Sequence, residues 1–176
     1  ARCAIRSPDP NYDAKRADIA QLLAQARASS RRLVVVYLDE VTFERQPTLA
    51  ASYAERGSDH LRAQLSHSAD TLSRVVASLE ALTGKVVYRR ANKIRLATLV
   101  QFYQDLRVAY SEAERIYVVQ DNWPVHTHPD LLVALEPQTT RWSFHRPKNW
   151  PTTPSAKTLS AWGSLQLPIQ ILPLPT

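Results

Sequence analysis

Two aspartates, Asp39 and Asp121, each come at the end of an apolar run of the chain. The runs read RRLVVVYLDE at 31–40 and RIYVVQDN at 115–122. Short segments rich in Val, Ile, Leu and Tyr are typical of strands that are covered on both faces, and charge is then expected where the strand emerges. If the two strands are neighbours, their carboxylates are suited to hold divalent metal ions that prefer oxygen ligands.

A single aspartate after a strand is more often a solvated turn residue, and that interpretation is open for each of the two acids. The repetition of the pattern favours a shared site. Glu40 follows Asp39 directly and should point to the opposite side of a continuing strand. We therefore leave Glu40 out of the candidate metal site and keep it as a weaker candidate.

The hydrophobic pattern predicts helices and strands in a mixed order. An apolar face at 19, 22, 23 and 26 indicates the first helix, and a glycine turn at 80–84 joins the two strands of a hairpin. The polar segment 59–70 is expected to be a loop, and the spacing of His60 and His67 there does not favour a metal site. The predicted helices are 12–28, 94–109, 129–135 and 155–162, and the predicted strands are 33–39, 48–54, 71–79, 85–88, 115–120, 142–144 and 168–172.

A meander of strands followed by strands that alternate with helices predicts an α/β fold with a mixed sheet. One side of the sheet is then an antiparallel meander and the other side is parallel, with helices flanking both. A ribonuclease H-like core has this order. Its first and fourth core strands are neighbours, which would bring Asp39 beside Asp121.

The length and composition limit the number of domains and the class of protein. A chain of 176 residues suits one α/β domain, and no segment is apolar over the length of a membrane span. The single cysteine, Cys3, excludes an internal disulfide framework and a cysteine-based zinc cluster, which fits a reducing cytosol. The chain starts at Ala1 and contains no methionine, so we expect a piece of a longer chain.

The net charge of +6 favours a polyanionic partner, although many basic proteins bind no nucleic acid. Segment 137–176 lacks Asp and Glu, and its basic residues alternate with aromatic ones, a pattern that suits a phosphate backbone and unstacked bases. The tryptophans there could equally pack under a proline-rich loop. A second basic cluster precedes the helix at 94–109 and could be a solvated face. The candidate DNA-binding residues are Arg89, Arg90, Lys93, Arg141, Arg146 and Lys148.

Four segments resemble a known family. They are YLDE at 37–40, ASLEALTGKVVY at 77–88, QDNWPVH at 120–126 and LPIQILPLPT at 167–176. Together they are similar to the catalytic domain of bacterial insertion-sequence transposases of the mariner-type superfamily, often labelled DDE superfamily endonucleases. The resemblance runs from about residue 7 to residue 176, and the order of the four segments makes it specific.

The resemblance implies a domain organisation. Residues 1–11 would be a linker from an N-terminal helix-turn-helix DNA-binding domain that precedes them. Residues 12–176 would be a ribonuclease H-like catalytic core that is incomplete at its C-terminus. The family's third acid would lie in a segment that begins right after Thr176, so this piece alone is expected to be inactive.

The resemblance also implies catalytic roles. Asp39 matches the first acid and would be the ligand shared by two Mg²⁺ ions, for which Mn²⁺ can substitute. Asp121 matches the second acid and would hold one ion. Asn122 would orient a metal-bound water or the phosphate, and His126 would contact phosphate or fix Asp121. For Asn122 and His126, local structural roles remain equally open.

The function implied by the resemblance is metal-dependent phosphoryl transfer, in which DNA is cleaved and joined during transposition. The partners would be double-stranded DNA, as transposon ends and as a TA target, and a second copy of the full-length protein. No membrane is involved, and the location would be the bacterial cytoplasm at the nucleoid. A catalytically inactive, transposase-derived DNA-binding or interaction protein is the alternative. A ribonuclease H-like nuclease of repair or recombination is a weaker one.

Overall fold

The computed structural model describes residues 8–29, 32–45, 53, 55–57, 71–138, 141–142 and 146–175. Within these residues, no helix combines the length and the apolar character needed to cross a membrane. The elements are α1 (Tyr12–Ala28), β1 (Leu33–Arg45), β2 (Thr71–Glu80), β3 (Val86–Ala91), α2 (Leu96–Ala109), β4 (Arg115–Gln120), the 3₁₀-helix η2 (Pro124–Thr127), α3 (Pro129–Leu132), α4 (Ala156–Trp162) and β5 (Ile169–Pro173).

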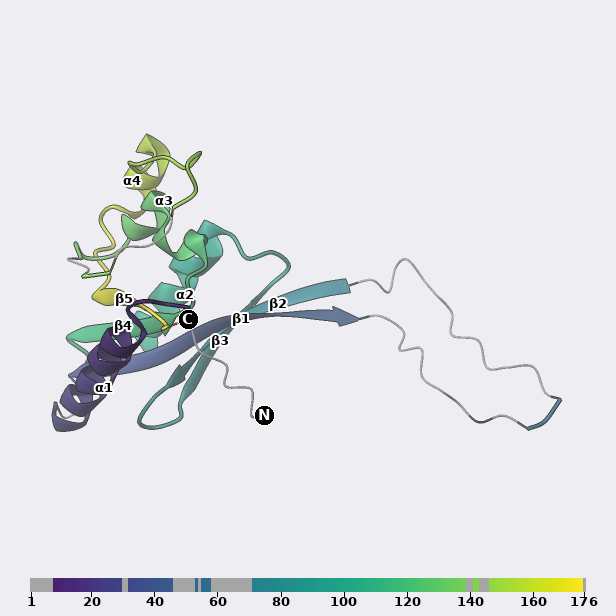
Figure 1. Cartoon of the computed structure of the whole chain (residues 1–176). Coiled ribbons are helices and arrows are strands. Elements are labelled where there is room, and N and C mark those ends of the chain that lie inside the picture. Colours follow the sequence, from purple (N-terminus) through teal and green to yellow (C-terminus); the bar gives the residue numbers. More distant parts are fainter. Residues whose placement is uncertain are drawn as a thin grey trace.

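The strands form one five-stranded sheet in the order β3-β2-β1-β4-β5 (Figure 1). β1, β2 and β3 pair antiparallel as a meander. β4 lies parallel to β1 on the other side, and β5 lies parallel to β4. This mixed sheet with its flanking helices is the ribonuclease H-like arrangement, so the fold class predicted from the sequence is confirmed.

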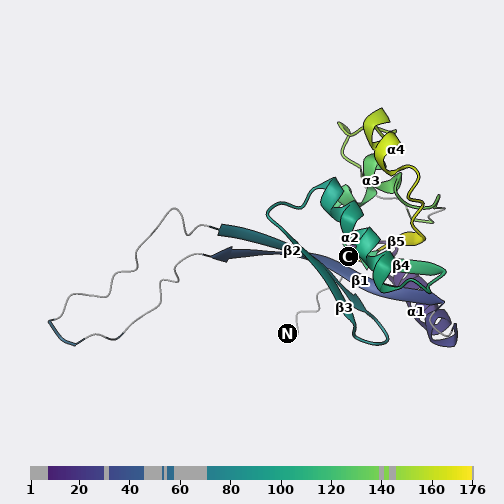
Figure 2. The same ribbon diagram turned by 180° about the vertical axis from the view of Figure 1, so that it is seen from behind.

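Helices cover the two faces of the sheet, and Figure 2 shows the same arrangement from behind. On one face, α2 buries Leu99, Phe102 and Leu106 against the strands. On the other face, α1 contributes Ile19 and Ala26 to a smaller apolar cluster. Alternate residues of β1 enter the two clusters, which explains why the central strands are apolar throughout.

β1 is longer than predicted. The expected strand stops at residue 39, whereas β1 continues to Arg45 because it pairs with β2 as far as the Arg45 and Thr71 positions. The ends of β1 and β2 project beyond the helices as a two-stranded ribbon (Figure 1). No helix among the described residues covers this ribbon, so its residues need not be apolar. The mixed polar and apolar residues after Glu40 therefore do not resemble a buried strand.

The segment after β4 also differs from prediction. The 3₁₀-helix η2 was not expected, and α3 ends at Leu132 rather than at 135. The reason for the early end is that Leu135 forms a parallel bridge with Leu167, which removes it from a helical conformation. The side chain of His128 accepts a hydrogen bond from the Asp130 amide and caps the start of α3.

The second hairpin strand, predicted at 85–88, is observed as β3 at Val86–Ala91, three residues longer at its end because it continues to pair with β2. The other predicted elements agree within one or two residues where the structure describes them. The hairpin turn depends on Gly84, whose φ of 73° favours a residue without a side chain. The predicted loop at 59–70 lies outside the described residues. So do the predicted strands at 48–54 and 142–144, except for Tyr53 and Trp142.

Candidate active site

The parallel pairing of β1 with β4 brings Asp39 and Asp121 to the same edge of the sheet. Val35 pairs with Tyr117, and Tyr37 pairs with Val119. Two more residues along each strand lead to the two aspartates. Both acids line one open groove of about 540 Å³, together with Leu79, Val86 and Leu174 among others. The sequence prediction that the fold brings these acids together therefore agrees with the structure.

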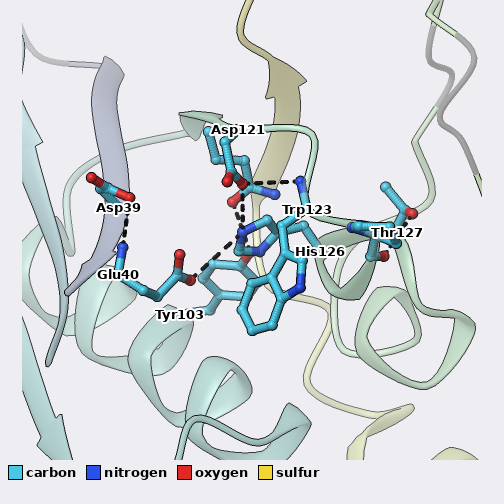
Figure 3. A network of polar contacts seen from close by, with 9 residues as sticks. Asp39, Glu40, Tyr103, Asp121, Trp123, His126 and Thr127 are labelled. Atoms are coloured by element: carbon cyan, nitrogen blue, oxygen red, sulfur yellow. Dashed lines mark hydrogen bonds and ion pairs between the residues drawn. The ribbon is translucent and has the colours of Figure 1, made fainter. Parts of the chain in front are cut away.

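Local hydrogen bonds orient both carboxylates. Oδ1 of Asp39 accepts a hydrogen bond of 2.8 Å from the Glu40 amide. Oδ1 of Asp121 accepts one of 3.0 Å from the Trp123 amide, which folds the chain back directly after β4. Figure 3 shows Asp39 on its strand and Asp121 next to Trp123 and His126. Asp39 is exposed, and the Asp121 side chain is 52% exposed, so each can reach a ligand from solvent.

The donor atoms fit a hard divalent cation. Mg²⁺ and Mn²⁺ prefer carboxylate oxygen and keep several water ligands, and two exposed carboxylates at one groove provide such oxygens. Over the described ranges, no three His, Cys, Asp or Glu side chains gather in a way that could enclose a metal ion. Asp39 and Asp121 therefore form an open pair of carboxylates and not, within the described residues, an enclosed metal site.

His126 is buried directly behind Asp121. Its side chain is 1% exposed, and Nε2 lies 3.2 Å from Oδ1 of Asp121. The Trp123 ring packs edge-on against the imidazole, with 5.4 Å between ring centroids. Of the two roles implied for His126, the structure places it for contact with Asp121, because a buried ring does not face a phosphate in solvent. Asn122 is exposed and lies next to Asp121 along the chain.

Glu40 also approaches His126, a contact that sequence reasoning did not anticipate. Its side chain does point away from Asp39, as strand alternation predicts, but it points inward toward the histidine (Figure 3). Oε1 of Glu40 lies 3.6 Å from Nε2 of His126. The strand alternation indicated only that Glu40 lies on the face of β1 opposite Asp39, which is the face that α2 covers.

A buried polar pair lies beneath these residues. The Tyr103 hydroxyl donates a hydrogen bond of 3.3 Å to Oε1 of Gln120, and both side chains are fully buried. Burial raises the pKa of Tyr103 well above its usual value, and the charge of Glu40 raises it further. Tyr103 therefore stays protonated at neutral pH and acts as a hydrogen-bond donor within the support of the site.

The basic candidates fall into two groups. Arg89 makes two hydrogen bonds of 2.7 Å to Asp105 on α2, and hydrogen bonding to this carboxylate raises the pKa of Arg89. Arg141 pairs with Asp18 at 3.0 Å. Four further side chains are exposed, and no carboxylate in the described part of the chain pairs with them: Arg90, Lys93, Arg146 and Lys148.

Arg90 lies on the same face of the sheet as Asp39. Arg90 pairs with Val75, and Val75 pairs with Val41 on β1, two residues beyond Asp39. Residues at paired positions share a face, and so do residues two apart along a strand. Among the exposed basic candidates, Arg90 is thus the one that the strand register places on the same face of the sheet as Asp39.

The tryptophans of the C-terminal segment are packing residues. Trp142 is buried and donates a hydrogen bond of 3.1 Å from Nε1 to Asp18. Trp150 packs against His128, and Trp162 packs against the main core. The rings are thus packing residues, as the alternative stated from the sequence proposed, but they pack against α1, His128 and the main core and not together under one loop. Trp123 beside the site is the tryptophan that remains 42% exposed.

The fold and the site together define a ribonuclease H-like domain with two acids at the carboxyl edge of adjacent parallel strands. The family model described as DDE superfamily endonuclease matches residues 34–154, more than half of the chain. The chain therefore belongs to the DDE superfamily endonucleases, as the sequence resemblance indicated. No curated protein matches the chain.

The chain is also similar to solved structures of the Mos1 transposase. In the Mos1 paired-end complex with the left transposon end, the identity is 14% and the TM-score is 0.46, over 100% of this chain and 47% of that chain. For the Mos1 mariner paired-end complex with Mn, the identity is 15% and the TM-score is 0.46, over 100% of this chain and 46% of that chain. This chain thus spans about half the length of the Mos1 chains.

Proposed function

We propose that this chain is the catalytic core of a mariner-type DNA transposase that cleaves and joins DNA by metal-dependent phosphoryl transfer. The observation that carries the proposal is the placement of Asp39 and Asp121 at one groove on neighbouring parallel strands, in a chain of the DDE endonuclease family. Two exposed carboxylates at this place match what such chemistry requires of the protein.

Each residue of the site has a separate role in this proposal. Asp39 and Asp121 would hold Mg²⁺ or Mn²⁺, and the bound ions would supply stabilisation of charge on the attacking and leaving oxygens. The Trp123 amide and His126 orient the Asp121 carboxylate. Asn122, exposed beside Asp121, is available to contact a water or a phosphate oxygen.

The substrate in this proposal is double-stranded DNA, as transposon ends and target. The exposed side chains of Arg90 and Lys93 and those of Arg146 and Lys148 support it, since phosphate contacts provide most of the affinity for DNA. We further propose that the full-length protein acts as a homodimer in the bacterial cytoplasm, at the nucleoid. The linker at residues 1–11 would connect the core to a DNA-binding domain.

The test is DNA nicking by the full-length gene product with Mg²⁺ or Mn²⁺. Asp39→Asn and Asp121→Asn should each abolish nicking and leave DNA affinity within a few fold. Asp13→Asn, an equal change of charge at an exposed position of α1, is the matched control and should nick normally. Undiminished nicking in either site variant would refute the assignment.

An inactive, DNA-binding descendant of a transposase is the second candidate. The open ligand pair favours it to a degree, because two carboxylates alone hold a divalent ion weakly. A full-length product that binds DNA but does not nick it with either metal ion would support this candidate over an active enzyme.

A further inference from the structure

Glu40 is a half-buried acid that the proposed chemistry does not use. On β1 it pairs with Val76 of β2, which is fully buried, so its side chain enters the face of the sheet that α2 covers. The side chain is 15% exposed. Its Oε1 atom is buried and has no hydrogen-bond partner. A carboxylate in this setting needs a compensating polar group.

His126 is that group. Its Nε2 atom lies between two carboxylate oxygens, 3.6 Å from Oε1 of Glu40 and 3.2 Å from Oδ1 of Asp121 (Figure 3). The ring is 1% exposed and is held at its side by Trp123. The imidazole therefore connects an interior carboxylate of β1 with the exposed carboxylate that follows β4.

The position of this ring depends on both acids. Neither Nε2 contact has ideal hydrogen-bond geometry, which is the arrangement expected when one ring nitrogen is shared between two acceptors. Without Glu40, Asp121 is the one remaining carboxylate acceptor near Nε2 among the described residues, so the contact that orients the Asp121 carboxylate should change. Residues that orient a metal ligand from behind affect metal affinity strongly although they touch no metal.

We propose that Glu40 is a positioning residue: through the buried ring of His126 it fixes the orientation of the Asp121 carboxylate. Its value for metal binding rests on the function proposed above, whereas the link from Glu40 through His126 to Asp121 does not. In this proposal Asp39 binds the metal ion from one face of β1. Glu40, on the other face, orients Asp121, the second metal ligand.

Two measurements on the whole chain test the proposal. The first is NMR of the ring nitrogens of His126 and of the side-chain carboxyl carbon of Asp121. The second is Mn²⁺ binding by calorimetry. Glu40→Leu removes both oxygens, and Glu40→Gln keeps one. Glu44→Leu is the matched control, because Glu44 lies on the same face of β1, where the ribbon is exposed.

Glu40→Leu should shift the signals of His126 and Asp121 and weaken Mn²⁺ binding roughly 10-fold. Glu40→Gln should move both signals less, and Glu44→Leu should move neither. The Trp142 indole signal, far along the chain and packed on α1, should stay unchanged and exclude a general loss of structure. If Glu40→Leu does not fold, the Glu40→Gln variant tests the proposal. A complete lack of shift of the Asp121 signal in that variant would overturn it.

The two proposals fail in different ways. Mn²⁺ binding that needs Asp39 but is unaffected in Glu40→Leu, with an unmoved Asp121 signal, would overturn the role of Glu40 and leave the proposed function intact. A shifted Asp121 signal without any Asp39-dependent Mn²⁺ binding would support the link between the residues and refute the metal site.

Discussion

At the scale of single residues, neighbouring acids on one strand have separate environments. Asp39 and Glu40 point to opposite faces of β1, so one lines an open groove and the other contacts a buried histidine. Strand alternation predicted this separation from the sequence. The contact with His126 could not be predicted, because it depends on how the turn after β4 folds back over the sheet.

The hydrogen bond of Tyr103 leads to a prediction that changes with pH. Tyr103→Phe leaves Oε1 of Gln120 without its donor in a buried place, which should lower the free energy of unfolding by about 1 kcal/mol at pH 7. The native pKa of Tyr103 is raised above the value of 10.0 in an unfolded chain, by burial first and by Glu40 second. The stabilisation from this tyrosine is therefore complete below pH 10 and declines above it.

The decline has a definite size. At pH 11 the unfolded chain has released the Tyr103 proton and the native protein has not, which should cost wild type about 1.4 kcal/mol relative to the Phe variant. The two proteins should then be nearly equal in stability. Urea unfolding at pH 7 and 11 measures this, with Tyr88→Phe as an exposed control. A stability difference that stays constant over this range would contradict the burial of a neutral tyrosine.

At the scale of elements, two consecutive arginines of β3 lie on opposite faces of the sheet, and one is structural while the other is a DNA-binding candidate. Arg89 ties β3 to α2 through Asp105, whereas Arg90 lies on the opposite face, on the side of Asp39. Arg89→Ala should lower the free energy of unfolding by about 1 kcal/mol, a modest value because the pair is about one-third exposed.

Arg90→Ala should give the reverse pattern. Stability should hardly change, while DNA affinity should fall several fold, since one phosphate contact is lost. Urea unfolding and DNA titration of both variants measure the two effects. If Arg89→Ala weakens DNA binding more than Arg90→Ala does, the assignment of the two arginines is wrong.

Much of this layout followed from the sequence. The apolar runs before Asp39 and Asp121, the glycine turn at Gly84 and the alternation of elements predicted the mixed sheet and the pairing of the two acids. The extension of β1 was missed, because residues 41–44 alternate between apolar and polar instead of continuing the unbroken apolar run, and they are ordered by pairing with β2. The packing of Trp142 against α1 joins residues far apart in the chain, and no local pattern reports such contacts.

At the scale of the whole molecule, the excess of positive charge predicts how DNA binding responds to salt. Phosphate contacts release counterions, so the affinity of this chain for double-stranded DNA should fall steeply as salt rises, with a log–log slope of several units. Fluorescence anisotropy between about 50 and 200 mM salt measures the slope. A flat response would show that the exposed basic residues do not form a DNA surface.

The central claim is that Asp39 and Asp121 hold divalent metal ions together. Calorimetric titration of Mn²⁺ into this chain, and into Asp39→Asn, Asp121→Asn and the control Asp13→Asn, tests it most directly. We expect binding to wild type and to the control, and its loss in both site variants. Equal binding by all four proteins, or none to wild type and to the full-length gene product, would contradict the account.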